Sequence, residues 1–387
     1  MWLQVTLLSI FITTILAGIG ASPLLPSIAE HFTGGELFAH MFFVTPSLVS
    51  IPFLLLSGFL SSKISKIKLI KIGLVLFIIG GLGCMLAYNQ SSMLFFRAII
   101  GIALGLTMPL GVALISDYYY GPAREKVLSY SMIVTYASAI VILLLTGGLV
   151  LVYWRIAFLI NLIAIIPLFL ISKNLGAVQK KTFKHHYPVF FAFIFKIEIY
   201  KLLFLNFLVI LLTFVYFSNI TFFIIDTKIG GAFEASIAQS ITMFFAILSN
   251  FLMHPIKKIS AKILLALQTL FMAQALLMLS SYNISITEVY ISACLLGIGY
   301  GSFYSSIVAD ITTSSSRINK VNAIAFSVAS MYLAQFLSPL FFENFDAIFH
   351  IKNYATDFLL VGIFFSIFAI YLFIKFLLEH RKLIGVR

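Results

Sequence analysis

The chain has 387 residues, of which 61% are hydrophobic and only 10% are charged. Soluble globular proteins carry roughly 25% charged residues, so this composition excludes a water-soluble domain and indicates an integral membrane protein. The formal net charge is +12, which by itself is compatible with a nucleic-acid or a membrane-surface partner.

The chain consists of apolar segments of about 20 residues separated by short polar connections. Each segment is long enough to cross a hydrocarbon core of roughly 30 Å as a helix, whereas a β-barrel would show segments of about ten residues with alternating polarity. No basic stretch precedes the first segment, so we expect it to be a span and not a cleaved signal peptide. The predicted fold class is an all-α membrane protein with twelve transmembrane helices, over residues 4–28, 38–61, 69–88, 92–117, 127–150, 154–172, 202–226, 235–255, 263–281, 286–311, 323–342 and 355–378.

The longest polar connection, residues 173–201, divides the chain into two halves of six spans each. It contains the basic stretch "VQKKTFKHHYP", followed by "VFFAFIFKIEIYK", which is too short and too charged to cross the membrane. We expect this second stretch to form an amphipathic helix at the membrane interface. The predicted organisation is an N-terminal six-helix bundle (1–172), a cytoplasmic linker (173–201) and a C-terminal six-helix bundle (202–387).

Lysine and arginine residues gather in every second connection. If both termini are cytoplasmic, that side holds all 25 basic residues except Arg97, Arg155, Lys228 and Lys352, and eight of the 13 acidic residues fall on the other side. Cytoplasmic loops of membrane proteins carry such a basic excess. The pattern therefore predicts a multi-pass membrane protein with both termini cytoplasmic, and we expect the membrane to be the cell (inner) membrane. The lipid bilayer is then the expected partner, and nucleic acid is excluded.

Three short sequences recur at half the chain length. They are "SSKIS" at 61–65 with "IKKIS" at 256–260, "GIALG" at 101–105 with "GIGYG" at 297–301, and "REKVLSYS" at 124–131 with "INKVNAIA" at 318–325. Because the three offsets agree to within two residues, we expect two pseudo-symmetric bundles related by an axis along the membrane normal.

Several motifs lie in the N-terminal half at fixed places relative to the spans. The connection after the second span reads "GFLSSKISKIK" (58–68) and contains Gly58 and Lys66. The other motifs, in chain order, are formed by Arg97, Gly101 and Gly105; by Asp117, Pro122 and Arg124; by Gly147 and Gly148; and by Trp154, Arg155, Phe158 and Asn161. Together they resemble the major facilitator superfamily, and within it the twelve-helix drug:proton antiporter group, along the whole chain.

The sequence departs from the family pattern at two places. Ser62 stands where the family's loop motif has aspartate, and Ser65 stands where it has glycine. In the fifth span, Leu143 and Leu144 replace the Gly-Pro pair of the antiporter signature, although Gly147 and Gly148 remain within it.

The resemblance implies a secondary active transporter that works by alternating access of one central site. It implies proton-coupled efflux of amphiphilic small molecules by a monomer, with an ion gradient, H+, in place of any cofactor. No acidic residue lies in the first span, where such antiporters often carry one, so the proton carrier is left unassigned. The alternatives are a nutrient importer or a siderophore or metabolite exporter with the same fold. A membrane enzyme or sensor is a more remote alternative, because no catalytic motif, nucleotide-binding loop or metal-binding cluster is found.

The resemblance further implies that spans one, four, seven and ten line the cavity. A charge inside a span is a functional candidate, so we expect Arg97 to face the cavity and to bind an anionic group or to bias a proton-carrying acid. The alternative is a buried structural arginine bonded to main-chain carbonyls. The other candidate substrate or coupling residues are Asn206, Tyr216, Asn219, Tyr300 and Tyr304.

Gating residues are expected at the cytoplasmic ends of the helices. In the family, the equivalent of Asp117 pairs with the basic residue of the loop, here Lys66, when the outer side is open. The predicted gating set is Gly58, Ser62, Lys66, Asp117, Arg124 and Asp310, and Ser62 is expected to cap the start of the eleventh span. Small residues allow close helix approach, which assigns helix packing to Gly101, Gly105, Gly147 and Gly148.

Overall fold

A computed structural model describes residues 2–15, 17–175, 197–252, 260–281, 283–314, 320–349 and 353–384. Within these residues the secondary structure is helical, and twelve helical segments are long and apolar enough to cross a membrane. The first half contains α1 (Trp2–Ser9), η1 (Ile10–Thr14), η2 (Ile19–Leu24), α2 (Leu25–His31), α3 (Gly35–Lys63), α4 (Lys66–Leu86), α5 (Gln90–Tyr118), α6 (Gly121–Val152), η3 (Trp154–Ala164) and α7 (Ile165–Asn174). The second half contains α8 (Ile197–Asp226), α9 (Ala232–Leu252), α11 (Ala261–Leu279), α12 (Ile286–Ser314), α13 (Lys320–Phe349) and α14 (Tyr354–Ile384). The predicted all-α fold with twelve spans is confirmed.

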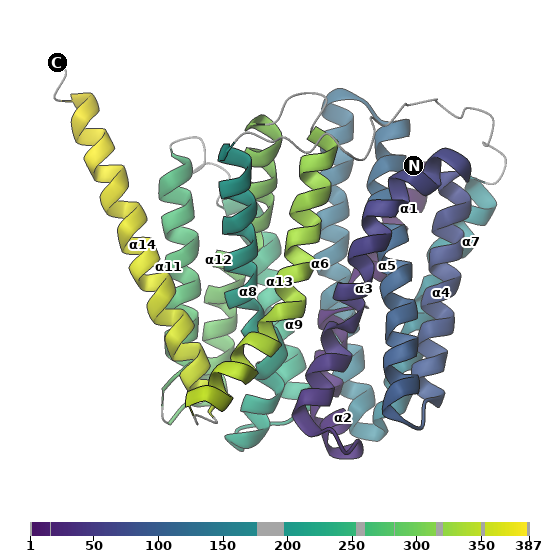
Figure 1. Cartoon of the computed structure of the whole chain (residues 1–387), viewed down its shortest axis with the longest axis horizontal. Coiled ribbons are helices and arrows are strands. Elements are labelled where there is room, and N and C mark those ends of the chain that lie inside the picture. The colour runs from purple at the N-terminus through teal and green to yellow at the C-terminus, as the bar shows by residue number, and fades with distance from the viewer. Residues whose placement is uncertain are drawn as a thin grey trace.

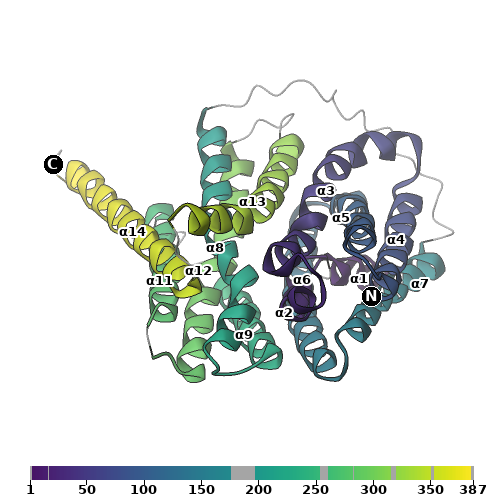
Figure 2. The ribbon, with the colours of Figure 1, turned by 60° about the horizontal axis from the view of Figure 1, so that its bottom comes forward.

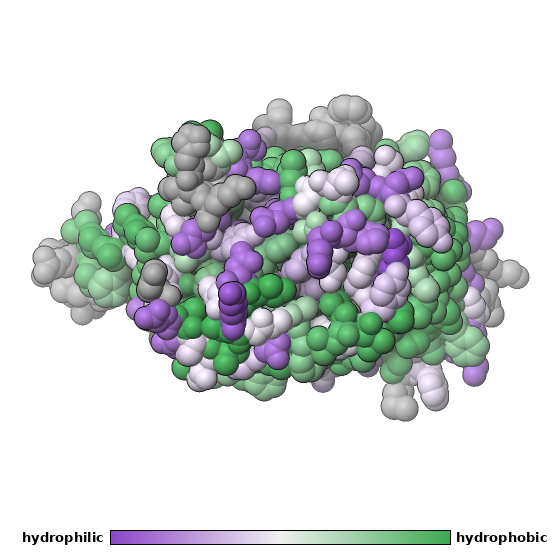
Figure 3. Space-filling view, turned by 90° about the horizontal axis from the view of Figure 1, so that it is seen from below, coloured by the Kyte–Doolittle hydropathy of each residue, from purple (hydrophilic) through white to green (hydrophobic). Residues whose placement is uncertain are grey.

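The helices stand side by side, and both ends of the chain lie on the same side of the bundle (Figure 1). We call this the termini side and the other the opposite side. Seen from a tilted direction, α1 to α7 form one group and α8 to α14 another (Figure 2). The opposite side shows hydrophilic residues across its middle and hydrophobic residues along its edge (Figure 3), as expected where helices leave an apolar solvent.

The second half repeats the helix packing of the first. Helix α5 packs on α3 and α4 in the first half, as α12 packs on α9 and α11 in the second. A Cβ atom on Gly101 or Gly105 would lie under 3.0 Å from a main-chain oxygen of α3, and one on Gly297 or Gly301 would meet α9 in the same way. The two glycine-containing repeats therefore occupy equivalent close helix contacts, where any larger residue would force the helices apart.

The lysine-rich repeats begin equivalent helices. The Ser65 hydroxyl caps α4 by accepting a hydrogen bond from the Lys68 amide at 3.4 Å. The Ser260 hydroxyl caps α11 by accepting from the amides of Lys262 and Ile263 at 3.2 and 3.4 Å. A side-chain acceptor at this position satisfies amides that the first turn leaves without partners, which explains why both repeats end in serine.

The structure differs from the sequence prediction near the linker. The described part of α8 begins at Ile197, so residues 197–201 continue a spanning helix instead of ending a separate interfacial helix. The rest of the predicted amphipathic segment lies among residues 176–196, outside the described residues. The predicted domain boundaries stay a prediction.

The first span is not one continuous α-helix. It passes from α1 into the short 3₁₀ segments η1 and η2, with a break around residues 15–18, before α2 begins. Pro23 lies inside η2 and Pro26 lies in the first turn of α2. Because proline has no amide proton, this part of the span leaves carbonyl groups that need other donors.

Candidate functional site

A cavity of about 410 Å³ lies between the two halves. Four helices form its walls, and in each helix the lining residues lie in the part nearer the termini side. The lining residues are Ser129, Met132, Ile133 and Tyr136 of α6; Ile247, Asn250 and Phe251 of α9; Leu264 of α11; and Ser302, Ser305, Ser306 and Ala309 of α12. None of these side chains is charged. The wall is apolar with several hydroxyl groups and one amide, which is the usual composition of a small-molecule pocket.

Hydrogen bonds hold the polar groups of the cavity in place. The Asn250 amide donates to the Gly301 carbonyl at 3.2 Å, and its oxygen accepts from the Ser305 hydroxyl at 2.9 Å. The Tyr136 hydroxyl reaches the same Gly301 carbonyl from the other half at 3.5 Å. Residues of α6, α9 and α12 thus converge on one point of the wall, where a ligand could contact both halves at once.

The largest contacts between the two halves are those that α6 forms with α9 and α3 forms with α13, and η2 and α2 add smaller contacts with α8 and α9. In the α6–α9 interface, the Ser240 hydroxyl donates to the Ile140 carbonyl at 3.4 Å, and a Cβ atom on Gly147 would lie 2.1 Å from the Ser236 hydroxyl oxygen. These contacts lie nearer the opposite side, while the same two helices line the cavity nearer the termini side. The predicted packing residue Gly148 has no neighbour within 4 Å of a Cβ atom.

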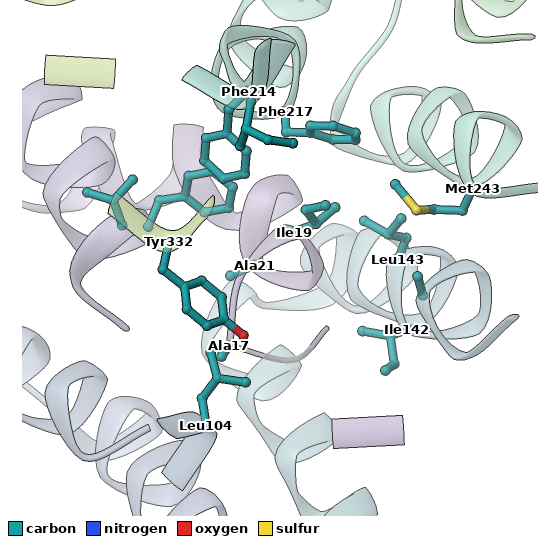
Figure 4. Packing of buried hydrophobic residues seen from close by; sticks show 14 of the residues in the cluster. Ala17, Ile19, Ala21, Leu104, Ile142, Leu143, Phe214, Phe217, Met243 and Tyr332 are labelled. Atoms are coloured by element: carbon teal, nitrogen blue, oxygen red, sulfur yellow. The ribbon is translucent and has the colours of Figure 1, made fainter. Parts of the chain in front are cut away.

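The first span closes the space beyond the cavity. The Ser22 hydroxyl donates to the Phe217 carbonyl at 2.7 Å and lies 2.9 Å from the donating amide of Gln239. Phe43 of the first half stacks on Phe214 of the second, with ring centroids 5.4 Å apart. Hydrophobic side chains from both halves also face one another here (Figure 4). In this conformation the cavity therefore lies on the termini side, and packed contacts close the opposite side.

The Lys66–Asp117 pair is present, but in a conformation closed on the opposite side; with the termini cytoplasmic as expected, the resemblance places the pair in the conformation open on that side. The Lys66 ammonium lies 2.8 and 2.6 Å from the two carboxylate oxygens of Asp117, joining the start of α4 to the end of α5. In the second half, Lys262 of α11 and Asp310 of α12 line one smaller cavity of about 170 Å³. Each half thus has a lysine at the start of one helix, α4 or α11, and an aspartate near the end of the next helix, α5 or α12. Arg124 is exposed at the start of α6.

We predict that exchanging the first pair restores what a single change removes. Asp117→Lys places two cations together and should lower transport about tenfold or more, because like charges repel where a bidentate contact existed. Adding Lys66→Asp should return part of the activity. Transport rates of the two single variants and the double variant, at equal protein levels, test this. Equal losses in the double and the Asp117→Lys variant would contradict a role for the pair.

Among the described residues, Ser62 makes no contact with α13. Ser62 is exposed, and its hydroxyl donates to the Phe59 carbonyl of its own helix at 2.7 Å. A Cβ atom on Gly58 would have no neighbour within 4 Å. Residues 315–319, just before α13, lie outside the described residues. The described residues therefore leave Ser62 and Gly58, at the termini-side end of α3, without a contact to the other half.

Arg97 does not line the cavity in this structure. It is 1% exposed, and its guanidinium donates to the carbonyls of Phe42, Ala17 and Phe43 at 2.9, 2.8 and 3.2 Å. It also lies over the Phe42 ring, 4.3 Å from the centroid. The structure thus matches the alternative interpretation, a structural arginine bonded to main-chain carbonyls.

The other predicted lining residues do not belong to the cavity wall either, although Tyr300 and Tyr304 lie near Tyr136, which does. The Asn206 amide donates to two oxygen atoms of α13 at 3.1 and 2.8 Å, and the Tyr216 hydroxyl lies 3.2 Å from a threonine hydroxyl of α9. Tyr300 packs its ring on α8, and Tyr304 lies with Tyr300 near Tyr136. Asn206 and Tyr216 lie away from the cavity because other helices enclose α8, whose most apolar stretch is 83% buried. Its polar groups bond to the helices around it.

Asn219 leads to a buried acid that the sequence did not single out. Its amide donates to a carboxylate oxygen of Asp357 at 3.3 Å, and both side chains are almost fully enclosed. The sequence counted Asp357 among the acids on the outer side, at the start of the predicted span 355–378. It lies in the first turn of α14, as that span implies, but it is 1% exposed.

The chain is similar both to a protein-family profile and to individual curated proteins. The sequence profile of the Major Facilitator Superfamily matches residues 6–339. The "Uncharacterized MFS-type transporter EfpA" of Mycobacterium tuberculosis is 28% identical over 133 residues, which are 34% of this chain and 25% of that protein. The "Quinolone resistance protein NorB" of Staphylococcus aureus is 32% identical over 128 residues, which are 33% of this chain and 28% of that protein. The match therefore spans about a quarter of the length of these curated relatives.

Proposed function

The chain belongs to the major facilitator superfamily and is a membrane transporter, and we propose that it exports amphiphilic small molecules by proton-coupled alternating access. The observation that carries this proposal is the cavity between the halves, open toward one side of the bundle and closed toward the other. Rocking the halves about this site would expose it to each side in turn.

The wall of the cavity favours substrates without a fixed charge. The described lining residues carry no charge and offer hydroxyl groups and the Asn250 amide within an apolar surface. Burying an ion without a partner costs free energy. An uncharged molecule with an apolar body and a few hydrogen-bonding groups could instead pack its body on the apolar wall and bond to the hydroxyl and amide groups. The substrate class we propose is therefore a neutral amphiphile of drug-like size.

One observation is compatible with export, and a second supports it. The basic residues of the chain favour a cytoplasmic termini side, which would open the cavity to the cytoplasm in this conformation. One relative that matches a third of the chain is named a quinolone resistance protein. Nutrient import by the same fold is the second candidate, since a cavity open to the cytoplasm is also the release state of an importer.

Sealed inverted vesicles test the direction and the coupling. We expect a neutral fluorescent amphiphile to enter these vesicles when their lumen is acidified, and its addition to make the lumen more alkaline. Accumulation found only in right-side-out vesicles would contradict export and favour the importer.

A change in the cavity tests the site. Asn250→Leu should lower transport about tenfold, because a buried polar contact to substrate is worth about 1–3 kcal/mol. Asn344→Leu is the matched control: Asn344 is exposed on α13 and bonds only to the Leu340 carbonyl of its own helix among the described contacts. Transport by both variants is compared at equal amounts of folded protein. Equal rates for the Asn250 variant and the control would exclude this cavity as the substrate site.

A further inference from the structure

His40 of α3 is a buried histidine whose ring has no ordinary partner. The residue is 5% exposed, and neither ring nitrogen has a hydrogen-bond partner among the described residues. Its ring meets Phe222 of α8 edge-on, with centroids 5.5 Å apart. Buried polar atoms in folded proteins are almost always hydrogen-bonded. A buried imidazole without such a bond therefore calls for a functional explanation.

The nearest charged group comes from the other half. The His40 Nδ1 atom lies 3.9 Å from the Glu343 carboxylate of α13, too far for a hydrogen bond and within reach of an ion pair. This carboxylate oxygen also has no hydrogen-bond partner in the described part of the chain. About two turns further along the same α3–α13 interface, Ser47 donates to Gln335 at 3.1 Å. His40 and Glu343 therefore face each other across the surface at which the halves part.

Three further carboxylates are linked to this place through the aromatic ring that contacts His40. Tyr354 of α14 stacks on Phe222 and interacts with Glu36 of α3, Asp226 at the end of α8 and Asp357 in the first turn of α14. Among the described residues, His40 and Glu343 thus lie next to an aromatic pair that interacts with acidic groups from three helices.

We propose that His40 and Glu343 form a proton-binding site between the two halves, occupied when the opposite side is closed. A proton on His40 converts a contact between a neutral ring and a carboxylate into an ion pair that joins α3 to α13. When the halves part on that side, the pair separates and both groups meet water, where the proton can exchange. The proposal rests on the proposed alternating access, and it makes closure of the opposite side sensitive to pH; the group that carries protons across the membrane stays unassigned.

The sign of the effect follows from linkage. If closure brings an imidazolium and a carboxylate together, the closed state holds the proton more firmly than the open state does. By reciprocity, protons then favour closure to the same extent. Histidine changes charge between about pH 5 and 8, so acid should close the opposite side and alkali should release it. In an exporter this would return the empty carrier to the side where it meets substrate.

Distance measurements across the interface test the proposal without substrate. Spin labels at Leu37→Cys and Ile348→Cys, both at exposed positions on the opposite side, report the α3–α13 separation in the full chain in lipid nanodiscs. Cys294→Ser removes the other reactive thiol, since Cys84 is buried. From about pH 8 to about pH 5.5 we expect the ratio of closed to open molecules to rise about tenfold. His40→Gln and Glu343→Gln should each remove this pH response.

His31→Gln is the matched control. His31 lies near the same side, but its ring nitrogen is 3.2 Å from Arg155 of its own half, so this variant should keep the full pH response. The exchanged pair, His40→Glu with Glu343→His, should regain the response and so separates charge pairing from loss of folding. A full pH response in His40→Gln would overturn the proposal. Absence of export from vesicles would count against the proposed function alone, because the distance measurement needs no substrate.

Discussion

Replacing Arg97 with methionine is expected to destabilise the N-terminal half by about 3–6 kcal/mol. The change leaves the carbonyls of Ala17, Phe42 and Phe43 without the donor that now reaches them. Each buried group that loses its partner costs about 1–3 kcal/mol. The apparent melting temperature of the detergent-solubilised protein should therefore fall markedly, together with the amount of folded protein.

The backbone around Arg97 explains why an arginine is needed there. In an unbroken helix the Phe42 carbonyl would accept from the amide of residue 46, but this residue is Pro46 and has no amide proton. The Ala17 carbonyl lies at the break in the first span, where the amide of Ala21 bonds to Gly18 instead. One guanidinium with several donors in a rigid plane can satisfy carbonyls from both helices, which a lysine could not do equally well.

A double-mutant cycle separates this explanation from a role in transport. Pro46→Ala gives the Phe42 carbonyl a helical donor, so Arg97→Met should cost about 1–2 kcal/mol less in that background. If Arg97 instead bound an anionic substrate or biased a proton carrier, Arg97→Met would lower transport in a protein of unchanged stability. Equal costs of Arg97→Met with and without Pro46 would contradict the structural explanation.

The same residues show what the sequence could and could not predict. Apolar length predicted the twelve spans, because the bilayer imposes it, and three short repeats at half the chain length predicted that the two halves are equivalent. The role of Arg97 was left open, because its acceptors are main-chain atoms up to 80 residues away. A proline one turn after a carbonyl is visible in the sequence, but the helix that will supply the missing donor is not.

The cavity was harder to predict for a different reason. Expected lining residues were the bulky polar ones of spans seven and ten, yet α8 lies inside its half and its polar groups bond to neighbouring helices. The wall is made by serines such as Ser302 and Ser305 and by Asn250, which look unremarkable in a helix. Likewise, Glu343 was assigned to a loop, because the predicted span ended at residue 342 whereas α13 continues to Phe349. These contacts depend on the direction of each side chain. To predict that direction, one must know how each helix is rotated about its own axis, which the length of an apolar segment does not give.

Gly147→Val should abolish most transport while leaving each half folded. A Cβ atom at this position would lie 2.1 Å from the Ser236 hydroxyl oxygen and 2.6 Å from its Cβ. Ser236 is fully buried in the α6–α9 interface, so the added methyl groups can be accommodated only if α6 and α9 move apart. Overpacking costs about 1–3 kcal/mol, which at about 1.4 kcal/mol per tenfold corresponds to roughly a 5- to 150-fold shift away from the state closed on the opposite side.

Two further variants test whether Gly147→Val lowers transport by preventing closure of the opposite side. Ser236→Gly removes the atoms that a side chain at position 147 would meet, so adding it to Gly147→Val should restore much of the transport. Gly148→Val should be harmless, because a Cβ there meets nothing within 4 Å. Labels at Val152→Cys and Lys228→Cys, both exposed on the opposite side, should report separation in Gly147→Val alone. If Gly147→Val lowers transport while this separation is unchanged, the α6–α9 contact is not the step that limits alternation, and the close packing at Gly147 serves folding instead.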